Sequence, residues 1–201
     1  MKSKTYVLLT MTLALFVMPT TAALADHHTT EYNVKAGFIF NFIKYITWPW
    51  EKLTTEKNDD PIVIGIIGVN PFGRVFEPIT KKKIKNKKLV IRYFPGFKQT
   101  GGKYNNSNTE NLRKCHVLFV SSSEKKYTQK IIELVTGSNV LTVSDTDDFV
   151  EIGGIINFIT EESKIRFSIN LDAAKRSELV VPTTILKIAK KVIHEREKSN
   201  G

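Results

Sequence analysis

The stretch Gly153–Lys190, GGIINFITEESKIRFSINLDAAKRSELVVPTTILKIAK, decides the fold. Two runs of β-forming residues, Ile155–Thr160 and Lys164–Asn170, flank three polar residues, and this order predicts a β-hairpin. In the second run apolar side chains recur at every second residue, which is the period of a strand with one buried face. The first run is apolar almost throughout, which predicts a more central strand that is covered on both faces.

Upstream of this hairpin, predicted strands alternate with predicted helices. The opening helix from Glu31 to Trp48 has an apolar stripe that includes Val34 and Phe38, with Lys35 at a polar position, and Pro49 ends it. Strands are expected at 62–68, 88–94, 116–121 and 140–143, and helices at 72–79, around 111, at 124–136 and at 183–195. Residues 98–108 are rich in Gly and Asn and predict a loop. We therefore expect an α/β fold with a mainly parallel central sheet, helices on both faces and a C-terminal antiparallel hairpin.

The N-terminus has the pattern of a secretory signal peptide. Two lysines precede an apolar run, and the small residues around Ala25 suit cleavage before Asp26. An uncleaved membrane anchor is the alternative, but a helix needs about 20 apolar residues to span a bilayer, and this apolar run is shorter. We expect residues 1–25 to be the signal peptide and residues 26–201 to form a single domain in the periplasm. Cleavage removes two lysines and no acid, so the formal charge falls from +10 to about +8, which favours acidic partners, while nucleic acid is not expected in that compartment.

Two blocks of sequence carry a family resemblance. The first is Tyr32-Asn33-Val34-Lys35-Ala36, followed by Asn-Phe and then by Trp48-Pro49. The second is the order Gly-Gly, Asn-Phe, Ile-Arg-Phe, Ile-Asn, Ala-Ala and Leu-Lys-Ile-Ala within the stretch quoted above. Together, from Glu31 to Lys191, they resemble the YfiR/HmsC-like family of small periplasmic regulators.

The resemblance implies a regulator without catalytic activity and without a cofactor. Such proteins repress an inner-membrane diguanylate cyclase by binding its periplasmic region, which lowers cyclic-di-GMP and biofilm or exopolysaccharide output. An outer-membrane-linked partner sequesters them and so releases the cyclase, and relatives form homodimers. The partner expected here is therefore a membrane-bound cyclase or sensor protein.

Cysteine content separates this chain from some relatives, which carry cysteine pairs. Cys115 is the single cysteine, so the chain forms no internal disulfide. Its place before an apolar run favours a buried structural thiol, and an exposed thiol that pairs two chains is the alternative.

The candidate constellations for chemistry each have a simpler structural interpretation. The glycines between Gly65 and Gly73 match neither dinucleotide-binding nor P-loop spacing, which favours a tight turn over an anion site. The acids between Asp145 and Glu151 lack an EF-hand pattern, and the lysines of 81–88 suit a solvated surface or a patch for an acidic partner. Only His116 lies inside the fold, beside Cys115, so no catalytic residue is assigned. If cleavage exposes Asp26-His27-His28 as a new N-terminus, a square-planar Cu²⁺ or Ni²⁺ site is a separate hypothesis.

Aromatic residues near the predicted element ends are the candidates for partner binding. We assign this role to Trp48, Trp50 and Phe97, although core packing explains most such aromatics. A different class of function remains open, in which the chain is a periplasmic small-molecule-binding sensor domain. Its ligand would occupy the strand-to-helix turns near Gly68 or Asp145. An enzyme is the third hypothesis.

Overall fold

A central sheet of eight strands organises the computed structural model, which describes residues 21–49, 60–100, 103–105 and 109–194. The sheet contains β1 (Ile62–Ile67), β2 (Lys83–Ile84), β3 (Lys87–Phe94), β6 (Val117–Val120), β7 (Leu141–Ser144), β8 (Ile156–Glu161), β9 (Lys164–Asn170) and β10 (Lys191–Ile193). Their order across the sheet is β10-β9-β8-β7-β6-β1-β3-β2. The pairs from β3 through β1, β6 and β7 to β8 are all parallel, and β9 runs antiparallel to β8. The expected α/β class, the mainly parallel sheet and the antiparallel hairpin are confirmed.

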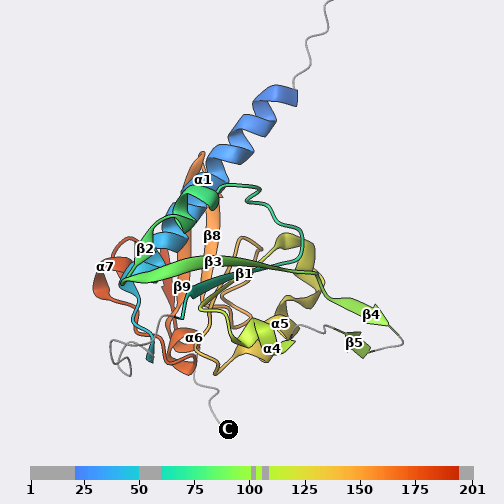
Figure 1. Ribbon diagram of the computed structural model, residues 1–201, viewed down its shortest axis with the longest axis vertical. Helices are drawn as coiled ribbons and strands as arrows, with labels where there is room; N and C mark the ends of the chain where they lie inside the picture. Colours follow the sequence, from blue (N-terminus) through green and yellow to red (C-terminus); the bar gives the residue numbers. More distant parts are fainter. Residues whose placement is uncertain (1–20, 50–59, 101–102, 106–108, 195–201) are drawn as a thin grey trace, which may run out of the picture.

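The two faces of the sheet are covered by different helices (Figure 1). The first face packs against α1 (Thr21–Tyr45), α6 (Leu171–Arg176) and α7 (Thr183–Leu186), and the second against α4 (Thr109–Arg113) and α5 (Thr128–Val135). In β1, Ile62, Ile64 and Ile66 belong to the first core, while Val63 and Ile67 belong to the second. This alternation follows from the two-residue period of a strand, and it explains why β1 is apolar at nearly every position.

The C-terminal segment differs from the prediction. The expected helix 183–195 is wrong, because α7 ends at Leu186 and the chain then forms β10, which pairs in parallel with β9. The backbone N–H of Lys190 donates to the carbonyl of Phe167 (2.8 Å), which starts this pairing. The apolar residues of 183–195 recur at helical spacing, but residues 191–193 form a strand because the backbone groups at the edge of β9 can pair with them.

Four further predictions need correction. Residues 98–108 were expected to be a loop, but β4 (Lys98–Thr100) and β5 (Lys103–Asn105) pair as a separate hairpin. The expected helix 124–136 is split into a 3₁₀ helix, η1 (Ser122–Tyr127), and α5. The helix expected at 72–79 is reduced to α3 (Glu77–Thr80), because Asn70 accepts a hydrogen bond from the N–H of Phe72 (2.9 Å) and stabilises a turn instead. The opening helix begins at Thr21, not at Glu31.

Candidate functional site

The polar loops that follow β1, β6 and β7 meet at one edge of the sheet. From β1 the chain moves to β3 on one side, and it later returns to β6 on the other side, so the direction of winding reverses between β1 and β6. In open α/β sheets, ligands bind outside the carboxyl ends of the strands at such a switch point. Gly68, Ser121 and Asp145 are the first residues after these three strands.

A hollow of about 940 Å³ lies at this switch point. Its walls are the loop from Val69 to Val75, the three serines 121–123 and the Tyr32 side chain of α1. Gly68 has a φ of 93°, and a Cβ there would approach Ser123 Oγ to 2.3 Å. Ser123 Oγ also accepts a hydrogen bond from the backbone N–H of Val69 (2.9 Å). The glycine therefore permits the close approach of the two loops that form the hollow.

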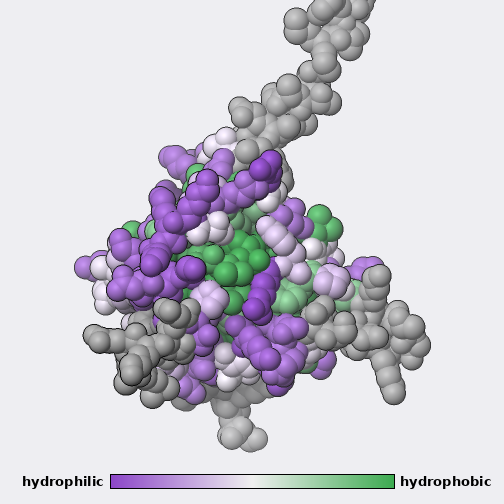
Figure 2. Space-filling view, viewed as in Figure 1, coloured by the Kyte–Doolittle hydropathy of each residue, from purple (hydrophilic) through white to green (hydrophobic). Residues whose placement is uncertain are grey.

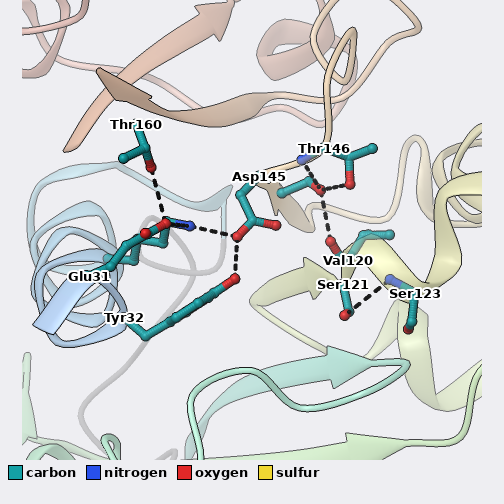
Figure 3. A network of polar contacts seen from close by, with 10 residues as sticks. Glu31, Tyr32, Val120, Ser121, Ser123, Asp145, Thr146 and Thr160 are labelled. Carbon is teal, nitrogen blue, oxygen red and sulfur yellow. Dashed lines mark hydrogen bonds and ion pairs between the residues drawn. The ribbon is translucent and has the colours of Figure 1, made fainter. Parts of the chain in front are cut away.

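A buried ionic network joins α1 to the loop after β7 (Figure 3). Lys35 has only 2% of its side chain exposed, and its ammonium lies 2.6 Å from Asp145 Oδ2 and 2.5 Å from Glu31 Oε1. The Tyr32 hydroxyl donates to the same Oδ2 at 2.6 Å, and Thr160 donates to Glu31 Oε1 at 3.0 Å. Burial, followed by the hydrogen bond to Asp145, raises the pKa of the Tyr32 phenol far above its usual value, so this phenol remains a proton donor.

Neighbouring residues fix the position of Asp145. Ser144 Oγ donates to the carbonyl of Val120 (2.8 Å) and accepts from the backbone N–H of Thr146 (3.1 Å). With its amide nitrogen as the donor, Asn157 reaches the carbonyls of Ser144 (3.1 Å) and Thr146 (3.0 Å). Hydrogen bonds therefore fix the backbone on both sides of Asp145, and Tyr32 and Lys35 of α1 bind its carboxylate.

A second hollow, of about 380 Å³, lies beside this network. It is lined by Lys35 and by the carboxylates of Glu31, Asp145 and Asp147, and it shares Tyr32 and Ser122 with the larger hollow. The sequence had indicated Gly68 and Asp145 as possible ligand positions. It did not indicate Lys35. The sequence pattern placed Val34 on the apolar stripe of the opening helix and Lys35 at a polar position, but the structure buries Lys35 and leaves Val34 43% exposed.

Two of the three aromatic candidates for partner binding are buried in the structure. Trp48 and Phe97 are 2% and 7% exposed, so both rings are packed within the chain. Phe97 lies 6.0 Å from the ring of Tyr127, and its backbone N–H donates to Glu124. Trp50 lies outside the described residues. Partner binding by these three residues stays a prediction.

The remaining candidates do not form a reactive centre in the described part of the chain. Cys115 is buried, which confirms the structural thiol, and burial raises its pKa to about 12. His116 Nδ1 accepts from the backbone N–H of Val63 (3.1 Å). Among the described residues there is no group of three or more His, Cys, Asp or Glu that suits a metal ion. The side chains of His27 and His28 lie outside the described residues.

The mainly parallel sheet, covered by helices on both faces and with polar loops at one edge, defines an α/β domain. The chain belongs to the YfiR/HmsC-like family, whose model matches residues 32–190. This family is regulatory and its members are periplasmic. Within the described residues, no helix has both the length and the apolar character that crossing a membrane requires.

Comparison with solved structures gives weaker similarity. A structure titled as the ABC domain in complex with L-Trp from Streptococcus pneumonia has a TM-score of 0.46 and 13% identity over 66% of this chain and 56% of that chain. A conserved domain protein from Vibrio cholerae O1 biovar El Tor has a TM-score of 0.45 and 13% identity over 73% and 60%. The chain thus spans less than two thirds of either structure. A search of curated proteins finds no match.

Proposed function

We propose that this protein is a periplasmic repressor of an inner-membrane diguanylate cyclase. It binds the periplasmic region of the cyclase, lowers cyclic-di-GMP and so reduces biofilm and exopolysaccharide output. The observation that carries the proposal is the family match over residues 32–190, which includes every strand of the central sheet except β10. Repression requires only that the protein bind the inactive state of the cyclase more tightly than the active state.

The surface supports a role in protein binding. Figure 2 shows an apolar area in the middle of one face, between α1 and β3 in this view, with hydrophilic residues around it. An apolar centre with a polar rim is the usual anatomy of a protein–protein interface. We extend the proposal to a homodimer and to an outer-membrane-linked protein that sequesters the repressor.

The deciding experiment measures intracellular cyclic-di-GMP in a deletion strain, its parent and a complemented strain. Repression predicts a rise on deletion that complementation reverses. Complementation with Trp50→Ala tests the predicted partner contact, and Ile152→Ala, at an exposed apolar residue elsewhere, is the matched control. An unchanged cyclic-di-GMP level in the deletion strain would contradict the repressor function.

Export to the periplasm is part of the proposal. Cleavage after Ala25 would remove the first five residues of α1, which begins at Thr21, and would leave Asp26 at the start of the helix. Mass spectrometry of the protein from a periplasmic extract should give a chain that begins at Asp26. Recovery of the uncleaved chain with the inner membrane would show that the N-terminus is an anchor.

A second candidate function is the binding of a small solute. It is favoured by the hollow of about 940 Å³ at the switch point and by the smaller hollow that adjoins it. Both volumes are in the range of small-molecule sites in proteins. A ligand bound here would contact α1 and three loops at once, so it could change the state of a regulator.

A further inference from the structure

We propose that the outer edge of β3 binds an extended acidic segment of a partner protein, which adds a strand to the central sheet. The inference rests on the proposed role in protein binding, and it names the chemistry of the bound segment rather than the partner. Three observations carry it: the backbone groups that β3 leaves unpaired, the positive charge along this edge and the apolar area beside it.

The backbone of β3 is paired on one side only over most of its length. It pairs with β1 from Leu89 to Phe94, but on the other side β2 covers only its first two residues. The N–H of Gly68, just after β1, donates to the carbonyl of Phe94 (3.1 Å), so the backbone groups of Phe94 face β1. These groups point to alternate sides along a parallel strand, so those of Ile91 and Tyr93 point outward. Within the described chain they meet no further strand.

The charge of this edge favours an acidic strand. From Lys81 to Arg92 the sequence has seven basic residues and no acidic one. Lys83, Lys88 and Arg92 are exposed and form no ion pair with a carboxylate of the described residues. Pairing of β3 with the β3 of a second copy would bring like charges together, which disfavours a dimer at this edge. An acidic segment that adds to the edge would instead oppose these charges.

The two faces of β3 favour different side chains in the added strand. Ile91 packs against the first core but is only partly buried, and Tyr93 on the same face is 57% exposed. This face borders the apolar area between α1 and β3 (Figure 2). Arg92 is exposed on the opposite face. We therefore expect a segment in which apolar residues, beside Ile91 and Tyr93, alternate with acidic residues beside Arg92.

Isothermal titration of the purified protein with three short capped peptides tests the proposal. The first alternates Val and Glu, the second alternates Val and Lys, and the third is the acidic peptide with Pro in place of its central Val residues. Only the first should bind, because the second has the wrong charge and the third lacks backbone donors that a strand needs. Its binding should slow the hydrogen exchange of the outward amides of Ile91 and Tyr93.

Two variants change the edge in different ways. Tyr93→Pro removes an outward N–H but no bond to β1, so it should weaken the acidic peptide at least about tenfold, whereas Tyr93→Thr retains the donor and should weaken it less. Arg92→Glu, which leaves the backbone unchanged, should weaken it about three- to tenfold, because an attractive cross-strand pair becomes repulsive. Lys126→Glu makes the same change of charge at an exposed lysine away from the edge and should leave binding nearly unchanged.

Binding of the Val-Glu peptide alone, weakened by Tyr93→Pro and by Arg92→Glu, would support the proposal. Equal binding of the Pro-containing peptide, or unchanged binding to folded Tyr93→Pro, would overturn strand addition. Slow exchange of the two amides at high protein concentration without peptide would show that a second copy occupies the edge. Absence of binding of the acidic peptide, or binding that Arg92→Glu does not weaken, would overturn the acidic partner. These results are separate from the cyclic-di-GMP level in the deletion strain, so either proposal can fail alone.

Discussion

At the scale of single residues, His116 makes the stability of the protein depend on pH. Burial, reinforced by the positive charge of Lys87, lowers the pKa of its imidazole to about 4, and Asp60 opposes this shift. The unfolded chain, with a pKa near 6.5, therefore takes up the proton first as the pH falls. The contribution of neutral His116 to stability is complete above about pH 6.5 and is lost as the pH falls toward 4.

We expect His116→Asn to reduce this dependence. Asn can still accept the hydrogen bond from Val63 but does not titrate. Because one pKa unit corresponds to about 1.4 kcal/mol, the wild type should lose a few kcal/mol more than the variant between neutral pH and pH 4. Urea unfolding at several pH values measures the difference, and His194→Asn, at an exposed histidine, is the control. Parallel pH profiles for wild type and His116→Asn would contradict the assignment.

Cys115 should be inert in the folded protein. Its thiol is buried, and the raised pKa of about 12 keeps it protonated at neutral and mildly alkaline pH. In the folded protein a disulfide reagent such as dithionitrobenzoate should label less than about a tenth of the chains, because the thiol is reached only when the structure opens locally. In denaturant it should label all of them. Rapid labelling without denaturant, or a disulfide-linked dimer on a non-reducing gel, would show that the thiol is accessible.

At the scale of elements, Asn170 joins the end of β9 to the start of α6. Its Oδ1 accepts from the N–H of Ala173 (2.9 Å) as a helix cap, and its Nδ2 donates to the carbonyl of Val150 (2.8 Å). Asn170→Ala removes both bonds in a fully buried place and should cost about 2–4 kcal/mol in the free energy of unfolding. Asn170→Asp retains the cap acceptor but turns a carboxylate oxygen toward the carbonyl of Val150, so it should be destabilised as well. Urea unfolding measures these losses, and a free energy for Asn170→Ala within about 0.5 kcal/mol of the wild type would contradict the role of Asn170.

The elements also show how far a sequence can predict this fold. The prediction of β9 was correct at both ends, because its alternate residues face a core and the Asn170 cap ends it. β10 was missed because a three-residue strand has no periodicity of its own and exists only through the exposed edge of β9. In the site, the glycines near Gly68 and the acidic residues near Asp145 indicated the two turns from the sequence alone. No local pattern indicated the role of Lys35, because its partner Asp145 is 110 residues away in the sequence.

At the scale of the whole molecule, the ion pair of Lys35 and Asp145 fastens α1 to the carboxyl edge of the sheet. Breaking a buried pair leaves an uncompensated charge, so Lys35→Met should cost about 3–5 kcal/mol in the free energy of unfolding. Lys44→Met, at an exposed lysine of the same helix, should change stability by less than about 0.5 kcal/mol.

The double variant Lys35→Met/Asp145→Asn distinguishes a true pair from two independent effects. If the charges act as a pair, removal of both should cost clearly less than the sum of the two single losses, because no unpaired charge stays buried. Urea unfolding supplies the four free energies, and hydrogen exchange of the α1 amides shows whether the helix itself is released. Additive losses would contradict the pair, and unchanged α1 exchange in Lys35→Met would mean that apolar packing alone holds the helix. A coupled loss with faster exchange in α1 would show that this ion pair, at the carboxyl edge of the sheet, holds the helix in place.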